Sequence, residues 1–392
     1  MKTNVRERSL FIYSTKLTEM ERFSSDESKR YLRQFVLPGF GREGQEKLKN
    51  GRVLVVGAGG LGSPILFYLA AAGVGKIGIV DGDTVNLTNL HRQILYNTRD
   101  IGKQKATSAA GRLRNLNPDI QTIALPVTVS SRNIFDIIKD YDIVVDATDN
   151  FPTRYLLNDA SVLMGKSLVY GSIFRYEGQV AVFNHDGGPN YRDLYPVPPA
   201  PGSVPDCEEG GVLGVLAGIV GCYQANEVIK ILTGMKDTLS GKLLVVDSQT
   251  SETRVINIPD RNAKSGIRNL VDYDEFCGHP TIKNNGIMKE ITVQELKKLK
   301  DENADFQLID VREPHEADIC EIGGELIPQG EIPANVDKIS RDKQVIIHCR
   351  SGARSGNMVK WLETNHGFTN LYNLKGGILA WAKEIDPEMP TY

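Results

Sequence analysis

Short apolar runs alternate with amphipathic segments in the first two thirds of the chain. Residues 53–56 are a continuous run of branched apolar side chains, which is typical of a strand buried in a parallel sheet. The same pattern predicts strands at 76–80, 120–125 and 142–146, and helices at 65–72, 134–139 and from about 101 to 116. This β-α-β alternation predicts a Rossmann-like α/β fold, an open and mostly parallel sheet with helices on both faces.

The alternation restarts on a smaller scale after residue 291. Thr292 is expected to cap a helix reaching Lys300, residues 306–310 and 345–348 are expected to be strands, and another helix is expected over 356–363. Polar residues without a clear period fill 261–288, which suits a linker between domains. The boundaries that we expect are a flexible extension at 1–25, a larger α/β domain at 26–260, this linker, and a smaller α/β domain at 289–392.

Charge and cysteine content exclude several classes of protein. The 392 residues carry 46 Lys and Arg against 49 Asp and Glu, so no basic surplus predicts a nucleic-acid partner. No run of about eighteen apolar residues predicts a membrane span, and the charged N-terminal stretch has no secretory apolar core. Five scattered cysteines do not form a disulfide framework. We therefore expect a cytoplasmic protein.

A glycine-rich loop follows the first strand. Gly57-Ala-Gly-Gly-Leu-Gly62 has the Gly-x-Gly-x-x-Gly spacing, which lets the backbone approach a phosphate at a helix N-terminus. Asp81 ends the next strand, roughly twenty residues on, where a carboxylate can hold a ribose hydroxyl. The loop alone indicates an adenine nucleotide. A tight turn without ligand and an NAD-dependent dehydrogenase remain open at this point.

Two polar clusters lie near that loop in the expected fold. Residues 88–93 are too rich in hydrogen-bonding groups to be core, and residues 147–150 follow the strand at 142–146. The carboxyl edge of a parallel sheet is where such folds place their ligands. A cysteine, Cys207, lies in the long irregular segment 186–209, just before an apolar helix expected over 212–232. A helix N-terminus stabilises a thiolate, so Cys207 is a candidate reactive thiol. An exposed loop cysteine without a function is an equally good interpretation.

A second cysteine has a more specific setting. Cys349 ends a strand and is followed by a loop of small and basic residues, including Arg350 and Arg354, and then by a helix. Such a loop surrounds one sulfur with backbone amides and positive charge, as a persulfide or a cysteinyl phosphate requires. A phosphatase-type loop would place its arginine six residues after the cysteine, whereas Arg354 comes five after Cys349. The shorter loop favours sulfur transfer over phosphoester hydrolysis, and a purely structural cysteine is the remaining alternative.

These motifs together resemble two known families. Residues 26 to about 260 resemble the ThiF/MoeB branch of the ubiquitin-activating-like superfamily, through the stretches 57–62, 80–81, 89–93, 149–154 and 207–214. Residues 289–392 resemble a rhodanese domain, through the stretches 308–314, 349–355 and 376–381. The fused order is that of the adenylyltransferase/sulfurtransferase proteins, and the resemblance covers nearly the whole chain.

The resemblance implies a two-step activation of a partner protein. A ubiquitin-like sulfur carrier of the MoaD, ThiS or CysO type, ending in Gly-Gly, would attack the α-phosphate of ATP through its C-terminal carboxylate and release pyrophosphate. Cys349, loaded as a persulfide by a cysteine desulfurase or by thiosulfate, would then attack the acyl adenylate and yield a thiocarboxylate. Cys207 would hold the carrier as an acyl disulfide or thioester, or resolve a disulfide. Arg350 and Arg354 would assist Cys349.

The family's site residues can be carried over by position. Gly60 would back the phosphates, Asp81 would hold the ribose, and Asp149 would hold Mg²⁺ with Asn150 beside it. Positive and amide groups at Asn89, Arg92 and Lys105 would neutralise phosphate charge. The full nucleotide site implied by the resemblance is Gly60, Asp81, Thr88, Asn89, Leu90, His91, Arg92, Lys105, Asp149 and Asn150. Arg33 would reach into the site of a partner subunit, so a homodimer is implied.

One departure from the family concerns a structural zinc. Many relatives bind it with two Cys-x-x-Cys pairs, but Asp193 stands where one cysteine is expected, and the stretch 274–277 keeps only Cys277. Four thiolates cannot be assembled, so we expect no zinc and a non-catalytic Cys277.

Alternative functions remain to be weighed against this one. A nucleotide-binding scaffold with degenerate sites is disfavoured because Arg92, Lys105, Asp149 and Cys349 are all retained. An NAD oxidoreductase would have no use for residues 88–92 or for the Asp149-Asn150 pair. An adenylyltransferase whose rhodanese domain supplies sulfur to another pathway is the closest alternative. The sequence leaves open the carrier and hence the pathway, which could be molybdopterin, thiamine, cysteine, tRNA thiolation or a secondary metabolite.

Overall fold

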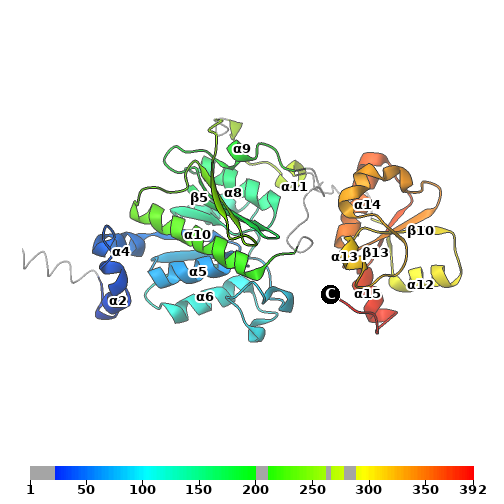
Figure 1. The fold of residues 1–392 in the computed structure, drawn as a ribbon, viewed down its shortest axis with the longest axis horizontal. Coiled ribbons are helices and arrows are strands. Elements are labelled where there is room, and N and C mark those ends of the chain that lie inside the picture. Colours follow the sequence, from blue (N-terminus) through cyan, green and yellow to red (C-terminus); the bar gives the residue numbers. More distant parts are fainter. Residues whose placement is uncertain (1–22, 200–210, 262–265, 278–287) are drawn as a thin grey trace, which may run out of the picture. The chain divides into compact units, whose positions relative to one another are not determined.

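The computed structural model describes residues 23–199, 211–261, 266–277 and 288–392, which fall into two compact α/β units (Figure 1). The first unit holds the described residues up to Pro198 and those between 211 and 277, and the second holds those from 288 onwards. Each unit has its own sheet and its own buried core.

An eight-stranded sheet runs through the first unit in the order β3-β2-β1-β4-β5-β6-β7-β8. Its strands are β1 (Arg52–Val56), β2 (Lys76–Val80), β3 (Gln121–Leu125), β4 (Ile143–Asp146), β5 (Ser167–Phe174), β6 (Glu177–Phe183), β7 (Lys242–Asp247) and β8 (Thr253–Asn257). The strands from β3 to β5 are parallel, and β6 to β8 continue the sheet antiparallel. The expected fold class is confirmed, and the mostly parallel sheet carries an antiparallel extension in β6 to β8.

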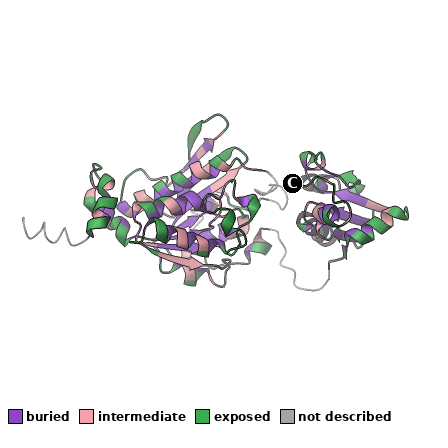
Figure 2. Ribbon diagram, turned by 90° about the horizontal axis from the view of Figure 1, so that it is seen from below, coloured by how far each residue is buried: buried purple, intermediate pink, exposed green. Residues whose placement is uncertain are grey.

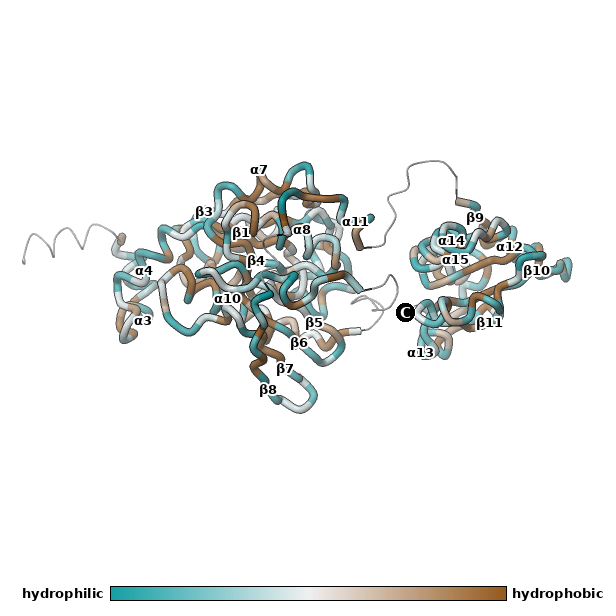
Figure 3. The backbone as a smooth tube through the Cα atoms, turned by 90° about the horizontal axis from the view of Figure 1, so that it is seen from above, coloured by the Kyte–Doolittle hydropathy of each residue, from teal (hydrophilic) through white to brown (hydrophobic). Residues whose placement is uncertain are grey.

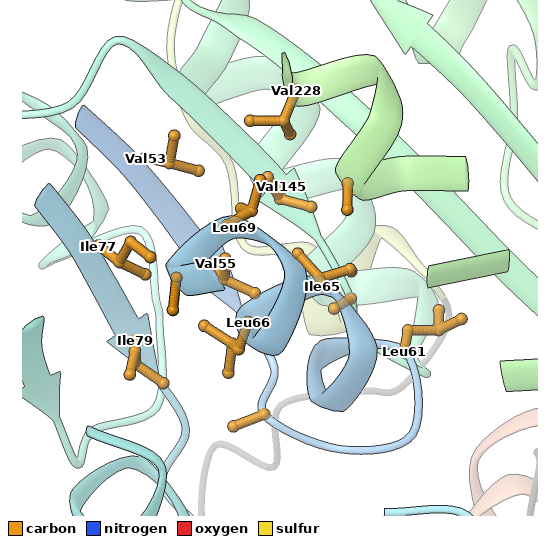
Figure 4. Close-up of a cluster of buried hydrophobic side chains, with 14 of the residues drawn as sticks. Val53, Val55, Leu61, Ile65, Leu66, Leu69, Ile77, Ile79, Val145 and Val228 are labelled. Atoms are coloured by element: carbon orange, nitrogen blue, oxygen red, sulfur yellow. The ribbon is translucent and has the colours of Figure 1, made fainter. Parts of the chain in front are cut away.

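Alternate residues of the central strand β1 point to opposite faces of this sheet. Val53 and Val55 pack on the side of α5 (Gly62–Ala72) and α10 (Gly214–Thr233), in the cluster shown in Figure 4. Leu54 and Val56 pack on the other side, in the cluster that includes the aromatic and aliphatic residues of α8 (Phe151–Leu163). Because both faces of β1 are buried, its sequence is continuously apolar, as a parallel strand between two helical layers requires.

The remaining helices of the first unit cover these two faces or the N-terminal edge. They are α2 (Ser25–Arg30), α3 (Leu32–Phe35), α4 (Gly41–Asn50), α6 (Lys105–Leu116), α7 (Ile134–Ile138), α9 (Tyr191–Leu194) and α11 (Tyr273–Phe276), with the 3₁₀ turns η1 (Leu87–Asn89) and η2 (Thr98–Asp100). The helices α2 and α3 are separated at Tyr31. Within the stretch expected to be a linker, α11 packs on α8 and buries Tyr273 and Cys277 in the first unit.

One helix, α10, is long and apolar enough to cross a membrane by length and composition, the sole such helix in the described residues. The sequence analysis expected no such stretch. In the structure α10 packs against α5, β5 and β6, and it buries Gln224 and Glu227 inside the unit. Its apolar character therefore matches that of a core helix.

The second unit is built on a five-stranded parallel sheet in the order β11-β10-β12-β13-β9. Its strands are β9 (Glu290–Ile291), β10 (Phe306–Asp310), β11 (Glu325–Leu326), β12 (Gln344–His348) and β13 (Leu371–Leu374). Its helices are α12 (Val293–Asp301), α13 (Pro314–Ala317), α14 (Ala353–His366) and α15 (Gly377–Glu384), with the 3₁₀ turns η4 (Gln329–Ala334) and η5 (Val336–Lys338). Thr292 caps α12 as expected. Its sheet is largely buried (Figure 2), and Cys349, directly after β12, is still inside the core.

Candidate active sites

The glycine-rich loop leaves β1 at the point where the sheet changes direction. The chain runs from β1 through β2 to β3 on one side and then crosses to β4 on the other side of β1. Ligands of open α/β sheets bind in the crevice outside the carboxyl ends of the strands at such a point. The ends of β1, β2 and β4 therefore define the candidate nucleotide site.

Glycine is required at two positions of this loop. Gly57 has a φ of 95°, and a Cβ there would lie 2.4 Å from the backbone oxygen of Ala147. A Cβ on Gly62 would lie 2.1 Å from the backbone oxygen of Gly57. Both contacts are too short for any side chain, so the loop folds directly onto the segment that follows β4.

Asp81 fixes the loop from the neighbouring strand. One carboxylate oxygen accepts a hydrogen bond from the Ala58 amide at 2.8 Å, and the other accepts from the Asp83 amide at 2.9 Å. Burial raises the pKa of Asp81, against the lowering effect of Lys105. Each oxygen retains a lone pair for a further donor, which is compatible with the expected ribose contact.

Tyr96 holds the same loop and was not singled out from the sequence. Its hydroxyl donates to the backbone oxygen of Ala58 at 2.8 Å and lies 3.3 Å from that of Lys105. Burial raises the pKa of Tyr96, so the hydroxyl stays protonated and remains a donor. The only signal for this role in the sequence was one tyrosine that follows a polar stretch.

Two of the expected cations lie close to the loop. A Cβ on Gly60 would lie 3.6 Å from Cγ of Arg92, and Lys105 Nζ pairs with a carboxylate oxygen of Asp83 at 2.9 Å. Arg92 Nη1 donates to the backbone oxygen of Thr88 at 3.2 Å and lies 2.7 Å from His91 Nε2. Desolvation, followed by the Arg92 charge, lowers the pKa of His91. The structure thus places two cationic side chains near the glycine-rich loop.

The expectation that residues 88–93 lie wholly outside the core is wrong for Asn89 and Gln93, which are both buried. Asn89 Oδ1 accepts from the Asn86 amide at 3.3 Å and completes the capping box of η1, whose N-cap is Asn86, and Leu90 packs against the hydrophobic core. Gln93 Oε1 has no hydrogen-bond partner among the described residues, and a Cβ on Gly59 would lie 3.4 Å from Gln93 Nε2. This buried, unpaired oxygen beside the glycine loop fits a site that a donor on a ligand would complete.

Asp149 and Asn150 lie at the end of β4. Asp149 is exposed, and Asn150 Oδ1 accepts from the Thr153 amide at 3.0 Å, so Asn150 caps α8. An exposed carboxylate that shares a cation with phosphates and water suits Mg²⁺. The described residues contain no group of three or more metal-ligating side chains, so a cation here would rely on ligands from the nucleotide.

A buried ion pair braces the segment that carries Asp149. Arg154 Nε lies 3.4 Å from Asp146 Oδ2, both side chains are buried, and Arg154 Nη2 donates to the backbone oxygen of Thr148 at 3.1 Å. The Thr148 hydroxyl donates to Asp146 Oδ1 at 2.6 Å. Removing either charge would leave the other buried and uncompensated. Sequence reasoning treated Arg154 only as part of a motif and missed this positioning role.

Two expected site residues are not brought to this group. Arg33 is exposed on α3, which packs mainly on α4, and the neighbouring Leu32, Val36 and Leu37 are 54%, 67% and 51% exposed. Cys207 lies outside the described residues, so its predicted setting cannot be compared, although the helix that follows it begins at Gly214 rather than at residue 212.

The candidate sulfur site is a tightly held loop after β12. Cys349 Sγ accepts from the Gly352 amide at 3.2 Å and lies 3.4 Å from the Ser355 hydroxyl. The first turn of α15 donates to the start of the loop, from the Ile378 amide to the Cys349 backbone oxygen at 2.9 Å. The sulfur therefore accepts a hydrogen bond from a backbone amide of its own loop.

Of the two arginines expected to add positive charge at this sulfur, Arg354 is paired with a carboxylate. Its two terminal nitrogens donate to the two carboxylate oxygens of Glu316 on α13, each at 2.6 Å. The carboxylate is buried, which would raise its pKa, but the bond from Arg354 and further hydrogen bonds lower the pKa of Glu316 to about 2. Arg350 Nε donates to the backbone oxygen of Tyr392 at 2.7 Å.

Hydrogen bonds hold together the region in which the zinc-binding cysteines of the family are missing. Asp193 is buried and accepts from the Asn190 amide at 2.8 Å and from the Arg261 amide at 2.9 Å. Burial raises the pKa of the Cys277 thiol to about 11. A neutral buried thiol and an acceptor carboxylate do not form a tetrahedral thiolate site, so the residues present do not fit zinc.

The chain can now be compared with known proteins. The model of the ThiF family matches residues 31–267, and that of the rhodanese-like domain matches residues 292–384. Solved structures of MccB from E. coli share the fold, one of them with a TM-score of 0.54 at 21% identity over 61% of this chain and 72% of that chain. The crystal structure of PaaA has a TM-score of 0.53 at 20% identity, covering 66% of this chain and 84% of that chain.

Curated relatives match over most of the length. The probable adenylyltransferase/sulfurtransferase MoeZ of Mycobacterium tuberculosis is 45% identical over 94% of this chain and 96% of its own. The adenylyltransferase and sulfurtransferase MOCS3 of Aedes aegypti is 40% identical over 95% of this chain and 91% of its own. The sulfur carrier protein adenylyltransferase of Thermus thermophilus is 50% identical over 66% of this chain and 99% of its own. The resemblance stated from the motifs is confirmed: this chain belongs to the ThiF family, with a rhodanese-like domain fused behind it, and is an adenylyltransferase/sulfurtransferase.

Proposed function

We propose that this protein uses ATP to adenylate the C-terminal Gly-Gly carboxylate of a ubiquitin-like sulfur carrier, and that Cys349 then delivers the sulfur that forms a thiocarboxylate. The observation that carries the proposal is the gathering of the glycine loop, Asp81, Arg92 and Lys105 at one sheet edge, in a chain that also holds the Cys349 loop. The relative from Thermus thermophilus is named for a sulfur carrier protein, which supports this class of substrate.

The first step is a displacement at phosphorus. The carrier carboxylate oxygen bonds to the α-phosphorus, the bond from that phosphorus to the bridging oxygen breaks, and pyrophosphate leaves. Such a reaction needs alignment and charge neutralisation more than covalent help. Arg92 and Lys105 supply positive charge at the phosphates, and Asp81 orients the ribose. Asp149 would hold Mg²⁺, which would neutralise charge on the triphosphate.

The second step transfers sulfur. The terminal sulfur of a Cys349 persulfide attacks the acyl carbon and AMP leaves, so that the carrier is joined to Cys349 through a disulfide. Cleavage of that sulfur–sulfur bond by a thiol releases the thiocarboxylate. We assign Cys207 to resolving this disulfide or to holding the carrier as an acyl disulfide or thioester. The persulfide itself comes from a cysteine desulfurase or from thiosulfate.

We further propose a homodimer in which Arg33 completes the site of the partner subunit. The exposed apolar residues Leu32, Val36 and Leu37 around Arg33 support an interface on this surface. A reducing, cytoplasmic setting agrees with the cysteines Cys222, Cys277, Cys320 and Cys349, which are all free thiols in the described part of the chain. The protein is proposed to function without the structural zinc of its relatives.

ATP–pyrophosphate exchange with a purified Gly-Gly carrier tests the first step, and mass spectrometry of that carrier after addition of thiosulfate tests the second. The expected product is heavier than the carrier by the replacement of one oxygen by sulfur. A carrier lacking its terminal glycine is the control and should support neither reaction. Exchange without thiocarboxylate would favour the alternative in which the rhodanese domain supplies another pathway. Absence of exchange with every Gly-Gly carrier of the source organism would refute the proposal.

A further inference from the structure

Three side chains meet in the interior beside the loop that carries Cys349. The Ser355 hydroxyl oxygen lies 3.4 Å from Cys349 Sγ and 2.6 Å from Asn373 Oδ1. Cys349 and Ser355 are completely buried and Asn373 is 3% exposed, so these groups must satisfy one another without bulk water. Asn373 comes from β13, outside the motif of the loop, and the sulfur chemistry described above gives it no role.

The position of Asn373 is fixed by its strand and by the helix that follows the loop. β13 pairs with β12 in parallel register, with Asn373 opposite Ile347, and the Asn373 amide donates to the backbone oxygen of Lys289 at 2.9 Å. Ser355 belongs to the first turn of α14, and a Cβ on its neighbour Gly356 would lie 3.3 Å from Asn373 Nδ2. The glycine therefore lets α14 approach β13 closely enough for the two side chains to bond.

The Ser355 hydroxyl cannot donate to both of its neighbours. A hydroxyl has one proton and two lone pairs, whereas the Oδ1 atom of an asparagine only accepts. The 2.6 Å contact with Asn373 therefore takes the Ser355 proton, and a lone pair of Ser355 Oγ is left facing Cys349 Sγ. A protonated Cys349 can donate its S–H to that lone pair. The arrangement of these three side chains thus suits a thiol.

An anionic sulfur needs the opposite direction of this hydrogen bond. In the reaction with thiosulfate the anionic sulfur of Cys349 attacks the outer sulfur, the sulfur–sulfur bond breaks, and sulfite leaves with the electron pair. The Ser355 hydroxyl can donate to the anion only by turning its proton away from Asn373. That turn leaves Asn373 Oδ1 buried without a donor, which opposes part of the stabilisation that the sulfur gains.

We propose that Asn373 is a positioning residue of the sulfur site, which holds the Ser355 proton away from Cys349 while the sulfur is a thiol and releases it when the sulfur is anionic. The inference rests on the proposed role of Cys349 as the sulfur-carrying residue. Asn373 acts through Ser355, to which it is hydrogen-bonded. Replacing its amide by an apolar group should therefore make the Ser355 proton available to the sulfur at all times.

Infrared spectroscopy of the full-length protein reads the direction of this hydrogen bond. The S–H stretching band of a thiol lies at lower wavenumber when the thiol donates a hydrogen bond. Subtracting the spectrum of the same protein with Cys349→Ala separates the band of Cys349 from those of the other thiols. After cyanide has removed any bound sulfur, the wild-type band should lie at lower wavenumber than the band in Asn373→Leu or in Ser355→Ala. A band at one position in all three proteins, or no Cys349 band in the wild type at neutral pH, overturns the proposal.

Sulfur transfer from thiosulfate to cyanide gives an independent readout. Asn373→Leu should raise kcat/KM for thiosulfate roughly twofold to fourfold, because one hydrogen bond becomes available to the anion while its nucleophilicity falls in part. The same substitution should change nothing in the Ser355→Ala background. Asn365→Leu, at an exposed position of α14, is the control and should leave kcat/KM unchanged. A fall in kcat/KM, as simple distortion of the site would cause, or a rise that persists without Ser355 overturns the proposal.

If Asn373→Leu does not fold, the smaller change Ser355→Ala decides. Its S–H band should lie at higher wavenumber than that of the wild type, and an unshifted band overturns the proposal. The role of Cys349 is tested separately by mass spectrometry of the wild-type protein after treatment with thiosulfate. Sulfur found on another cysteine would refute the proposed function, and with it a part for Asn373 in sulfur transfer, whereas the infrared bands would still report the direction of the hydrogen bond.

Discussion

The ion pair between Glu316 and Arg354 makes a strong prediction about the second unit. Both side chains are largely buried and are joined by two hydrogen bonds of 2.6 Å. A pKa lowered from 4.5 to about 2 corresponds to about 3 kcal/mol of stability. Glu316→Gln removes the charge but keeps the size of the side chain, so this variant should be less stable by about that amount at pH 7.

The sign of the pH dependence follows from the lowered pKa. The carboxylate of Glu316 stabilises the folded unit fully above its unfolded pKa of 4.5, and this contribution is lost as pH falls toward about 2. At pH 3 roughly half of the difference between wild type and Glu316→Gln should remain. Other groups also titrate in this range, but they are common to both proteins and cancel in the difference.

Tryptophan fluorescence reports the second unit alone. The chain contains two tryptophans, Trp361 and Trp381, and both belong to that unit. Urea unfolding of the full-length protein followed by this signal should show a midpoint lowered by about 2 M in Glu316→Gln at pH 7. Glu321→Gln, an exposed position in the same unit, is the matched control and should move the midpoint little. A Glu316→Gln midpoint equal to wild type, or a difference that is the same at pH 7 and pH 3, would refute the reasoning.

Four further variants test the two sites. Asp149→Ala should lose ATP–pyrophosphate exchange by at least about a hundredfold while keeping its fold by circular dichroism, because triphosphate charge is left uncompensated; near-normal exchange would contradict the assignment. Arg33→Ala should lose exchange similarly but recover activity when its subunits are mixed with Asp149→Ala, and no recovery despite subunit exchange would exclude a shared site. Cys349→Ala should keep exchange and lose thiosulfate sulfurtransferase activity, since the nucleotide site is built by the other unit. Asp193→Ala should lower the free energy of unfolding by roughly 1–3 kcal/mol, because the backbone amides that donate to Asp193 lose their acceptor. The wild-type protein should melt at the same temperature with and without a chelator, and a melting temperature that depends on the chelator would show a structural metal.

The strands that carry the sites could be predicted from sequence because their environment leaves a local signature. β1 and β2 are buried on both faces, so they are continuously apolar, and each is followed directly by its functional residue. β8, labelled in Figure 3, is exposed at every position, with Val255 and Ile256 at 58% and 52%, so neither alternation nor a continuous buried run marks it. The sequence pattern therefore did not predict the edge strand β8.

Within the candidate nucleotide site, the sequence spacing predicted which residues take part better than it predicted their burial and their contacts. Asp81 and Lys105 were found because their positions after a strand and at a helix start are fixed by the fold. The burial of Asn89 was missed because its side chain satisfies a local backbone amide in η1, which makes a polar residue compatible with the interior. The pair of Asp146 and Arg154 was missed because the stability of a buried charge depends on a partner's orientation, which spacing alone does not give.

The sulfur site shows the same limit more sharply, because its chemistry depends on charge that arrives from outside the motif. The seven residues from Cys349 to Ser355 specify a cradle of amides and two arginines, and the structure has both. Both arginines are held by residues outside the motif: Arg354 by Glu316, 38 residues before it, and Arg350 by Tyr392, beyond α15. Arg354 is neutralised by the buried carboxylate of Glu316, so its charge is already compensated within the unit. The shape of the loop therefore depends on the pair of Glu316 and Arg354, which the Glu316→Gln variant tests.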